Sequence, residues 1–255
     1  MLKAALIAAV VNLAGLAQAP TILALTKETP DPFIATIAAM KHSVAPVVCV
    51  EVKEGNARFL EVEGSALFIS QGGEFVTAAH VLQWMASNPS ACPTTAIFLP
   101  ATGWQPEKPD EVLFWFPFNV QDCAIDAPVD VAKCKPVHDL SDHQKGASFR
   151  IRPARFEYAA QPDGTQVAFT GFPLSNRDPM TSRAGIATHR NIVVDGELIS
   201  ELILDHVAWP GGSGSPVYLA DGRVIGILLA RGIQEATGVA VVRPSASLRQ
   251  ILGER

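Results

Sequence analysis

The feature that most constrains the fold of this 255-residue chain is a succession of short apolar and β-branched runs with turn residues between them. Most runs have three or four residues, which suits β-strands and is too short for buried helices. Gly and Pro, 19 of each, are distributed between the runs. Many short strands without alternating helices are typical of a sandwich or barrel, so we expect an all-β protein. The runs lie at 47–50, 66–69, 75–77, 96–99, 112–114, 129–131, 167–169, 192–194, 202–204, 224–229 and 239–242.

Two segments carry helical rather than strand periodicity. In residues 32–43, apolar side chains return at helical spacing and predict a short lead-in helix. Near the end of the chain, Leu248, Ile251 and Leu252 stand at i, i+3 and i+4, with Ser245 as a candidate N-cap. We therefore expect one short helix before the strands and another that closes the chain.

The first residues have the pattern of an export signal. One positive charge precedes an apolar stretch over residues 4–17, and small residues follow it. Cleavage after Ala19 would leave a proline next to the cut, which signal peptidase disfavours, whereas cleavage after Ala17 avoids this. An uncleaved membrane anchor that extends to Leu25 is the alternative. We expect residues 1–19 to be this signal or anchor and the protein to be exported, as a periplasmic or secreted protein.

Charge and cysteine spacing narrow the classes of function. The net charge is −5 and the pI is near 5.7, so we expect no nucleic-acid partner. The four cysteines contain no C-x-x-C pair, and nothing in the sequence indicates a metal or an organic cofactor. Export would permit disulfides, and Cys123 and Cys134, separated by a turn-like stretch, are the expected pair. Buried free thiols are the alternative.

A glycine-rich loop, Gly211-Gly212-Ser213-Gly214, offers a candidate nucleophile. A serine hydroxyl needs an adjacent base, and it needs backbone N–H groups directed at the oxygen that becomes negative during attack. Glycines before the serine allow a turn in which two amides converge, and the amides of Gly211 and Ser213 are the expected pair. A Gly/Ser loop between strands is also a common structural feature, so this assignment depends on its partners. We interpret Ser215 as a structural neighbour.

Two further residues would complete the arrangement that activates Ser213. His80 follows the run at 75–77 and is the expected general base. Asp130 stands between two valines in a strand-like run, where a carboxylate is costly to bury unless a donor such as an imidazole N–H bonds to it. Asp122 and Asp126 are the alternatives, in turn-like surroundings. We expect His80, Asp130 and Ser213 to form a catalytic triad.

The order His, Asp, Ser along the chain differs from the orders in subtilisin and in the α/β-hydrolases. With several flanking blocks, the sequence resembles the bacterial trypsin-like serine peptidases, the group that includes the HtrA proteases and the glutamyl endopeptidases. The blocks cover roughly residues 45 to 245. They are Gly64–Ile69, Thr77–His80, Asp130–Ala132, Gly171–Pro173, Gly185–Ala187, Gly211–Val217 and Val224–Ile227.

The resemblance implies an all-β fold of two six-stranded antiparallel β-barrels of chymotrypsin type, with a short C-terminal helix. The site would lie between the barrels, with His80 and Asp130 from the first and Ser213 from the second. Unlike the HtrA proteases, the chain shows no PDZ domain after its closing helix, so we expect no such partner domain. The expected divisions are a lead-in segment at 20–44, a first barrel at 45–145 and a second barrel at 146–255.

The resemblance also suggests the primary specificity pocket. Glutamyl endopeptidases carry a histidine on the strand after the nucleophile, where this chain has Leu228, so we do not expect a preference for acidic side chains. Counting back from Ser213 to the position of the trypsin pocket acid gives Val207. We therefore expect an apolar pocket lined by Val207 and Leu228.

These expectations describe a serine endopeptidase that cleaves protein or peptide substrates through an acyl-enzyme. A peptidase fold that binds peptides without cleaving them is one alternative. An active enzyme held latent by the segment before Ala45 is another. The sequence does not indicate an oligomeric state.

Overall fold

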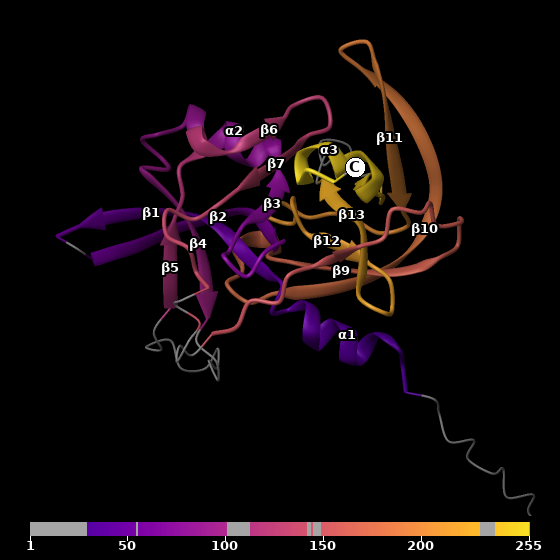
Figure 1. Ribbon diagram of the computed structural model, residues 1–255, viewed down its shortest axis with the longest axis horizontal. Helices are drawn as coiled ribbons and strands as arrows, with labels where there is room; N and C mark the ends of the chain where they lie inside the picture. The colour runs from indigo at the N-terminus through magenta and orange to yellow at the C-terminus, as the bar shows by residue number, and fades with distance from the viewer. Residues whose placement is uncertain are drawn as a thin grey trace, which may run out of the picture. The chain divides into compact units, whose positions relative to one another are not determined.

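The computed structural model describes residues 30–54, 56–100, 113–141, 144, 149–229 and 238–254. Residues Asp31–Arg255 form one unit, and the predicted signal or anchor at 1–19 lies outside the described residues. Two antiparallel β-sheets follow one another along the chain (Figure 1). The predicted all-β, chymotrypsin-like architecture is confirmed, including the short helices at both ends of the described chain.

The first sheet has seven strands in the order β5-β4-β1-β2-β3-β7-β6. The described residues provide no pairing that closes it into the six-stranded barrel that the resemblance implied. Two shifts of register between β1 and β2 bend this sheet. Its strands are β1 (Val44–Lys53), β2 (Asn56–Phe68), β3 (Phe75–Ala78), β4 (Thr94–Pro100), β5 (Leu113–Pro117), β6 (Ala124–Asp126) and β7 (Val131–Cys134).

The second sheet closes on itself. Its strands run in the order β12-β9-β10-β11-β14-β13, and β12 pairs with β13 to complete a six-stranded barrel, with β8 parallel to β13 at its edge. Closure removes the exposed strand edges at which sheets aggregate. Its strands are β8 (Arg155–Phe156), β9 (Gln166–Gly171), β10 (Met180–Val194), β11 (Glu197–Leu204), β12 (Pro216–Tyr218), β13 (Arg223–Leu229) and β14 (Ala240–Pro244).

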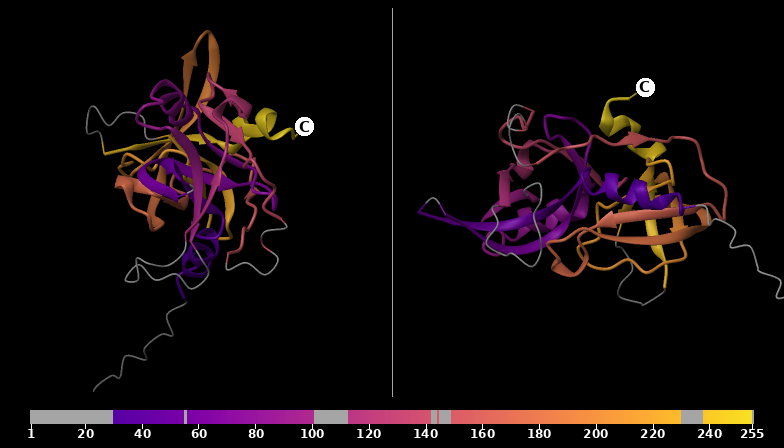
Figure 2. Two further views of the ribbon diagram at one scale, coloured as in Figure 1. Left: turned by 90° about the vertical axis from the view of Figure 1, so that its left-hand side faces the viewer. Right: turned by 90° about the horizontal axis from the view of Figure 1, so that it is seen from below.

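Alternating side chains pack the two sheets together. In β1, Val47 and Cys49 lie in the core of the first sheet, whereas Val48 and Val50 lie in a separate cluster. That second cluster also contains residues of the second sheet, such as Ile227. Successive residues of a strand point to opposite faces, so both faces of β1 are buried. The two views of Figure 2 show the sheets side by side.

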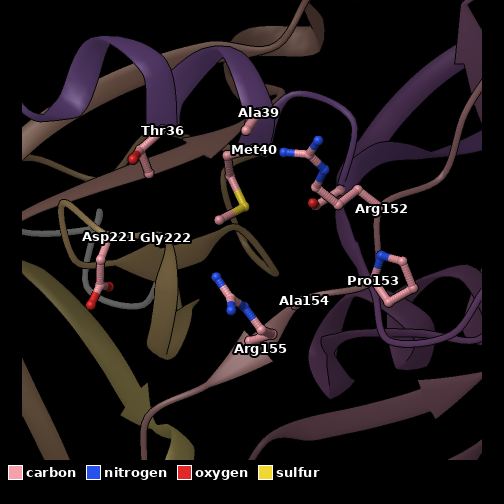
Figure 3. Close-up of a pocket in the computed structure, with 10 residues that line it drawn as sticks. Thr36, Ala39, Met40, Arg152, Pro153, Ala154, Arg155, Asp221 and Gly222 are labelled. Atoms are coloured by element: carbon pink, nitrogen blue, oxygen red, sulfur yellow. The ribbon is translucent and has the colours of Figure 1, made fainter.

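Helix α1 (Phe33–Met40) lies in the predicted lead-in segment and packs into this shared cluster through Phe33 and Met40. The Arg183 guanidinium lies 4.5 Å above the Phe33 ring. A cavity of about 100 Å³ separates α1 from the segment that carries Arg152 and Arg155 (Figure 3). None of the predicted triad residues lines this cavity. The helix is therefore part of the folded unit.

Helix α2 (Ala79–Ser87) follows β3 directly, and the chain closes with a 3₁₀ turn (Ser245–Leu248) and α3 (Arg249–Leu252). Ser245 does not act as an N-cap, because its hydroxyl donates to the Glu157 carbonyl instead. No helix in the described ranges is long and apolar enough to cross a membrane.

Two disulfides lie in the first sheet. Cys123–Cys134 is the predicted pair, and Cys49–Cys92 is a second bridge that the sequence did not indicate. Disulfides are typical of proteins that fold in oxidising compartments, which agrees with an exported protein.

Candidate active site

Ser213 lies in the loop between β11 and β12, which we call the Ser213 loop (residues 210–215). Gly211 and Gly214 have φ angles of +81° and +90°, in the left-handed region that favours glycine. A Cβ on Gly214 would lie 1.9 Å from the Ser65 carbonyl oxygen, so a side chain there would force the loop away from β2. The glycines of the motif are therefore required by the backbone path that presents Ser213.

His80 is the second residue of α2, immediately after β3. The imidazole is one-third exposed, with a side-chain exposure of 33%. Its Nε2 lies 2.8 Å from Ser213 Oγ, and its Nδ1 lies 2.9 Å from Asp130 Oδ2. Because a carboxylate only accepts hydrogen bonds, Nδ1 carries the proton and Nε2 accepts from the Ser213 hydroxyl.

Asp130 is buried, with 1% of its surface exposed, as predicted from its neighbours. Its surroundings differ from the prediction, because it ends a turn (residues 127–130, the Asp130 turn) and β7 starts only at Val131. Its φ is +60°, an uncommon conformation for a residue with a side chain. The strand-like run at 129–131 was therefore misread.

The Asp130 turn is docked on the first turn of α2. Asp130 Oδ1 accepts the His80 backbone N–H at 2.9 Å, and the Asp130 carbonyl accepts the Ala79 N–H at 3.2 Å. Both donors are N–H groups at a helix N-terminus, which have no acceptor within the helix and favour a negative charge. The carboxylate thus has a fixed position relative to the imidazole. The alternatives, Asp122 and Asp126, bond to Asn119 and to the Val129 N–H, respectively.

Ser65 ties the Ser213 loop to the first sheet. Its N–H donates to the Ser213 carbonyl at 2.7 Å, and its hydroxyl donates to the Gly211 carbonyl at 3.0 Å. The same hydroxyl accepts the Phe172 N–H at 3.0 Å. Ser65 belongs to the Gly64–Ile69 block, but sequence reasoning assigned it no role. A lone hydroxyl in an apolar run was the available signal.

The peptide between Pro210 and Gly211 is held separately. The Leu174 N–H donates to the Pro210 carbonyl at 2.7 Å. In a trans peptide the carbonyl and the N–H point in opposite directions, so the Gly211 N–H points away from Leu174. Leu174 and Ser175 both have a φ of +57°, which shows that this contact segment is itself conformationally constrained.

The two predicted pocket residues differ in exposure. Val207 is 39% exposed, whereas Leu228 is 1% exposed and lies in β13. Leu228 accepts the Gly214 N–H at 2.8 Å through its carbonyl, and its N–H donates to the Ser215 carbonyl at 2.8 Å. Its Cδ2 would lie 3.5 Å from a Cβ placed on Gly212. Leu228 therefore lies directly against the Ser213 loop.

A carboxyl group near this site has an altered affinity for protons. Burial raises the pKa of Glu63 to about 7, and the negative charge of Glu61 adds to the shift. Glu63 lies on β2, two residues before Ser65. In the described ranges, no three His, Cys, Asp or Glu side chains gather where they could hold a metal ion.

Known proteins share this fold and its sequence blocks. A family model described as a trypsin-like peptidase domain matches residues 64–227, which is more than half of the chain. The active form of the Rv3671c protease from M. tuberculosis is 17% identical, with a TM-score of 0.61 over 89% of this chain and 87% of that chain.

Two further solved structures are similar. The MamO protease domain from Magnetospirillum magneticum is 18% identical, with a TM-score of 0.58 over 83% of this chain and 96% of that chain. Deg5 is 15% identical, with a TM-score of 0.61 over 86% of this chain and 91% of that chain. At these identities the structural likeness establishes the fold. The match of the family model establishes the relationship: the chain belongs to the trypsin-like peptidase family.

Proposed function

We propose that the protein is a serine endopeptidase with His80, Asp130 and Ser213 as its catalytic triad. The observation that carries this proposal is the unbroken series of contacts from Asp130 Oδ2 to His80 Nδ1, at 2.9 Å, and from His80 Nε2 to Ser213 Oγ, at 2.8 Å. Both distances are within the range in which a base removes a proton from a nucleophile.

In the proposed reaction, His80 Nε2 takes the Ser213 hydroxyl proton as Oγ attacks the carbonyl carbon of the scissile peptide. The carbonyl π electrons move to its oxygen, and Asp130 stabilises the imidazolium that forms. The C–N bond then breaks, and the imidazolium donates its proton to the leaving amine. Water, deprotonated by His80, hydrolyses the resulting ester and restores the Ser213 hydroxyl.

The Gly211 and Ser213 amides are the proposed donors to the oxyanion. Two contacts support this assignment, because the Pro210 carbonyl is held by Leu174 and the Gly211 carbonyl is held by Ser65. Each contact fixes the plane of a peptide in the Ser213 loop before substrate arrives. Donors that need no reorganisation during the reaction contribute most to stabilising the developing charge.

We further propose that Val207 and Leu228 line an apolar primary pocket. The contact of Leu228 with the Ser213 loop supports this assignment. A peptide library should therefore be cleaved after aliphatic or small aromatic residues. Val207→Asp should shift this preference towards Lys and Arg, because a buried carboxylate favours a cationic partner. An unchanged preference would remove Val207 from the pocket.

Labelling with a fluorophosphonate probe tests the nucleophile. The native protein should label, and Ser213→Ala should not. Ser215→Ala is the matched control, because the Ser215 hydroxyl is also buried in the same loop and has no hydrogen-bond partner among the described residues. It should label as the native protein does.

Two outcomes would contradict the proposal. A folded native protein that neither labels nor cleaves any member of a peptide library would favour a binding protein on a peptidase fold. Loss of labelling in Ser215→Ala but not in Ser213→Ala would instead reassign the nucleophile.

A further inference from the structure

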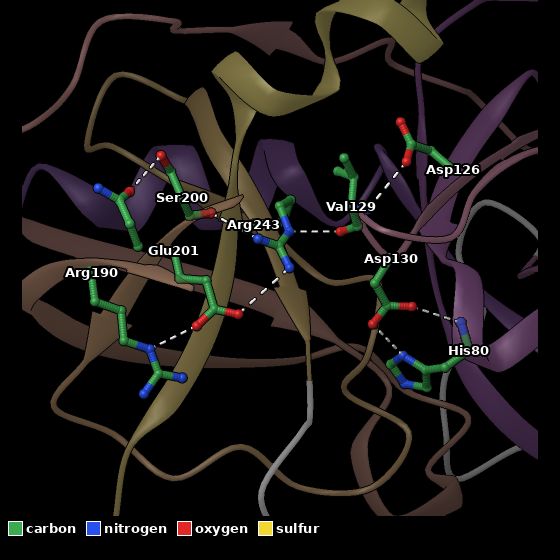
Figure 4. Close-up of polar contacts among 9 residues, drawn as sticks. His80, Asp126, Val129, Asp130, Arg190, Ser200, Glu201 and Arg243 are labelled. Atoms are coloured by element: carbon green, nitrogen blue, oxygen red, sulfur yellow. Dashed lines mark hydrogen bonds and ion pairs between the residues drawn. The ribbon is translucent and has the colours of Figure 1, made fainter. Parts of the chain in front are cut away.

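A buried arginine of the second barrel reaches the Asp130 turn of the first sheet (Figure 4). Arg243 lies in β14, and its side chain has an exposed fraction of 0%. Its Nε donates to the Val129 carbonyl at 2.6 Å, and its Nη1 donates to the Ser200 carbonyl at 2.8 Å. Val129 directly precedes Asp130, so this contact lies one peptide away from the triad.

The peptide between Val129 and Asp130 is held at both ends. Its carbonyl accepts from Arg243, and its N–H donates to the Ala127 carbonyl at 3.1 Å. These bonds fix the plane of the peptide immediately before the positive φ of Asp130, +60°. A non-glycine residue in this conformation costs about 1 to 2 kcal/mol, so other contacts must hold it there. Rotation of this peptide would turn the Asp130 carboxylate away from His80.

Stability alone does not account for the buried guanidinium. Arg243 Nη2 lies 3.5 Å from Glu201, which is 3% exposed, and Glu201 in turn lies 2.7 Å from the half-exposed Arg190. Removing such charges from water costs several kcal/mol per ion, and well-packed apolar residues are often as stabilising. What an apolar side chain could not do is donate to the Val129 and Ser200 carbonyls at the same time.

We propose that Arg243 is a positioning residue for the triad, acting through the Val129 carbonyl to hold Asp130 in contact with His80. This inference rests on the proposed function. The guanidinium must bond the Val129 carbonyl, the Ser200 carbonyl and Glu201 together, because Glu201 fixes its orientation and balances its charge. The second barrel thereby sets the geometry of a residue that belongs to the first sheet.

The test is the double variant Arg243→Met with Glu201→Gln, which removes the guanidinium without leaving a buried carboxylate unpaired. Its kcat should fall about a hundredfold, because misplacing a catalytic group by about 1 Å has an effect of that order. KM should be little changed, since no substrate contact is removed. The far-downfield proton resonance of the His80 Nδ1–H to Asp130 hydrogen bond should disappear or move.

The matched control is Arg190→Met. It removes the other guanidinium that contacts Glu201, is 51% exposed and does not contact Val129. Its kcat and its downfield resonance should equal those of the native protein. A folded double variant with native kcat and an unmoved resonance would overturn the proposal. So would an equal loss of activity in Arg190→Met.

Arg243→Lys decides the matter if the double variant does not fold. A single ammonium keeps the charge for Glu201 but cannot reproduce the guanidinium fork, so kcat should be reduced and the resonance moved. Native values for both would overturn the proposal. The resonance requires no turnover, so it tests Arg243 even if the native protein fails to label with fluorophosphonate and the proposed function is wrong.

Discussion

The Asp130 turn and the Ser213 loop are each held by the opposite half of the chain, but by different chemistry. The Ser213 loop of the second barrel is held by Ser65 through neutral bonds from one N–H and one hydroxyl. The Asp130 turn of the first sheet is held by Arg243, a buried cation. A negative charge develops transiently near Ser213, whereas Asp130 carries its charge permanently.

The difference suggests a rule for this site. Neutral supports at the Ser213 loop leave the local field to the backbone amides, which can act on the transition state alone. A cation behind the Asp130 turn is tolerated because the charge it faces is the same before and during the reaction. The following predictions test the two supports, beginning with the largest expected effect.

Asp130→Asn should lower kcat by about four powers of ten, because an amide in place of the carboxylate favours the wrong imidazole tautomer while keeping the geometry. Steady-state hydrolysis of a peptide substrate measures this. Asp122→Asn is the control, since Asp122 contacts only the exposed Asn119 in the printed bonds, and its kcat should be native. A large loss in Asp122→Asn would instead implicate the competing carboxylate.

Gly214→Ala should lower kcat by about a hundredfold and also lower the unfolding temperature, because its Cβ would lie 1.9 Å from the Ser65 carbonyl oxygen and displace the loop. Gly196→Ala separates this clash from backbone strain. Gly196 has a φ of +86°, close to the +90° of Gly214, but no atom lies within 4 Å of its added Cβ. It should keep native kcat, with a stability cost of about 1 kcal/mol.

Ser65→Ala should reduce kcat by roughly tenfold and stability by about 1 to 3 kcal/mol, because the Phe172 N–H is left buried without its acceptor. Chemical denaturation and peptide hydrolysis measure the two effects. Ser70→Ala removes a hydroxyl that accepts a backbone N–H in a turn before β3, away from the loop. If Ser70→Ala lowers kcat as much as Ser65→Ala does, the Ser213 loop does not depend specifically on Ser65.

Glu63 should make stability depend on pH on the Ser65 side only. Its folded pKa of about 7 exceeds the ordinary 4.5, so its contribution is fully present below pH 4.5 and is lost as pH rises through about 7. Glu63→Gln should therefore raise the unfolding temperature at pH 8 and leave it nearly unchanged at pH 4.5. Equal effects at both pH values would show that this carboxyl does not titrate as described.

Local motifs made the nucleophile and the base predictable. Ser213 and His80 were found from the glycines and apolar run beside them, because backbone constraints act over a few residues. Asp130 was identified partly for a wrong reason, since its burial comes from a turn docked on α2 and not from a strand. A left-handed φ leaves no mark in the sequence at a residue other than glycine.

Contacts between distant segments were not predictable. Arg243 follows an apolar run and reads as the end of a strand, although its partner Val129 lies 114 residues away. The short strands β6, β8 and β12 were missed because two or three residues carry no periodicity, and pairing with neighbours defines them. The same reason hid Cys49–Cys92, whose members are 43 residues apart.

The two disulfides distribute the protein's dependence on oxidation unevenly. The covalent loop closed by Cys49–Cys92 contains His80, and the loop closed by Cys123–Cys134 contains Asp130. By the chain-entropy model, closing loops of 43 and 11 residues disfavours the unfolded state by about 4 and about 3 kcal/mol. All four cysteines of the chain precede residue 135, so the barrel that carries Ser213 has no cross-link to lose. Reduction would therefore act on the base and its carboxylate and leave the nucleophile's own barrel intact.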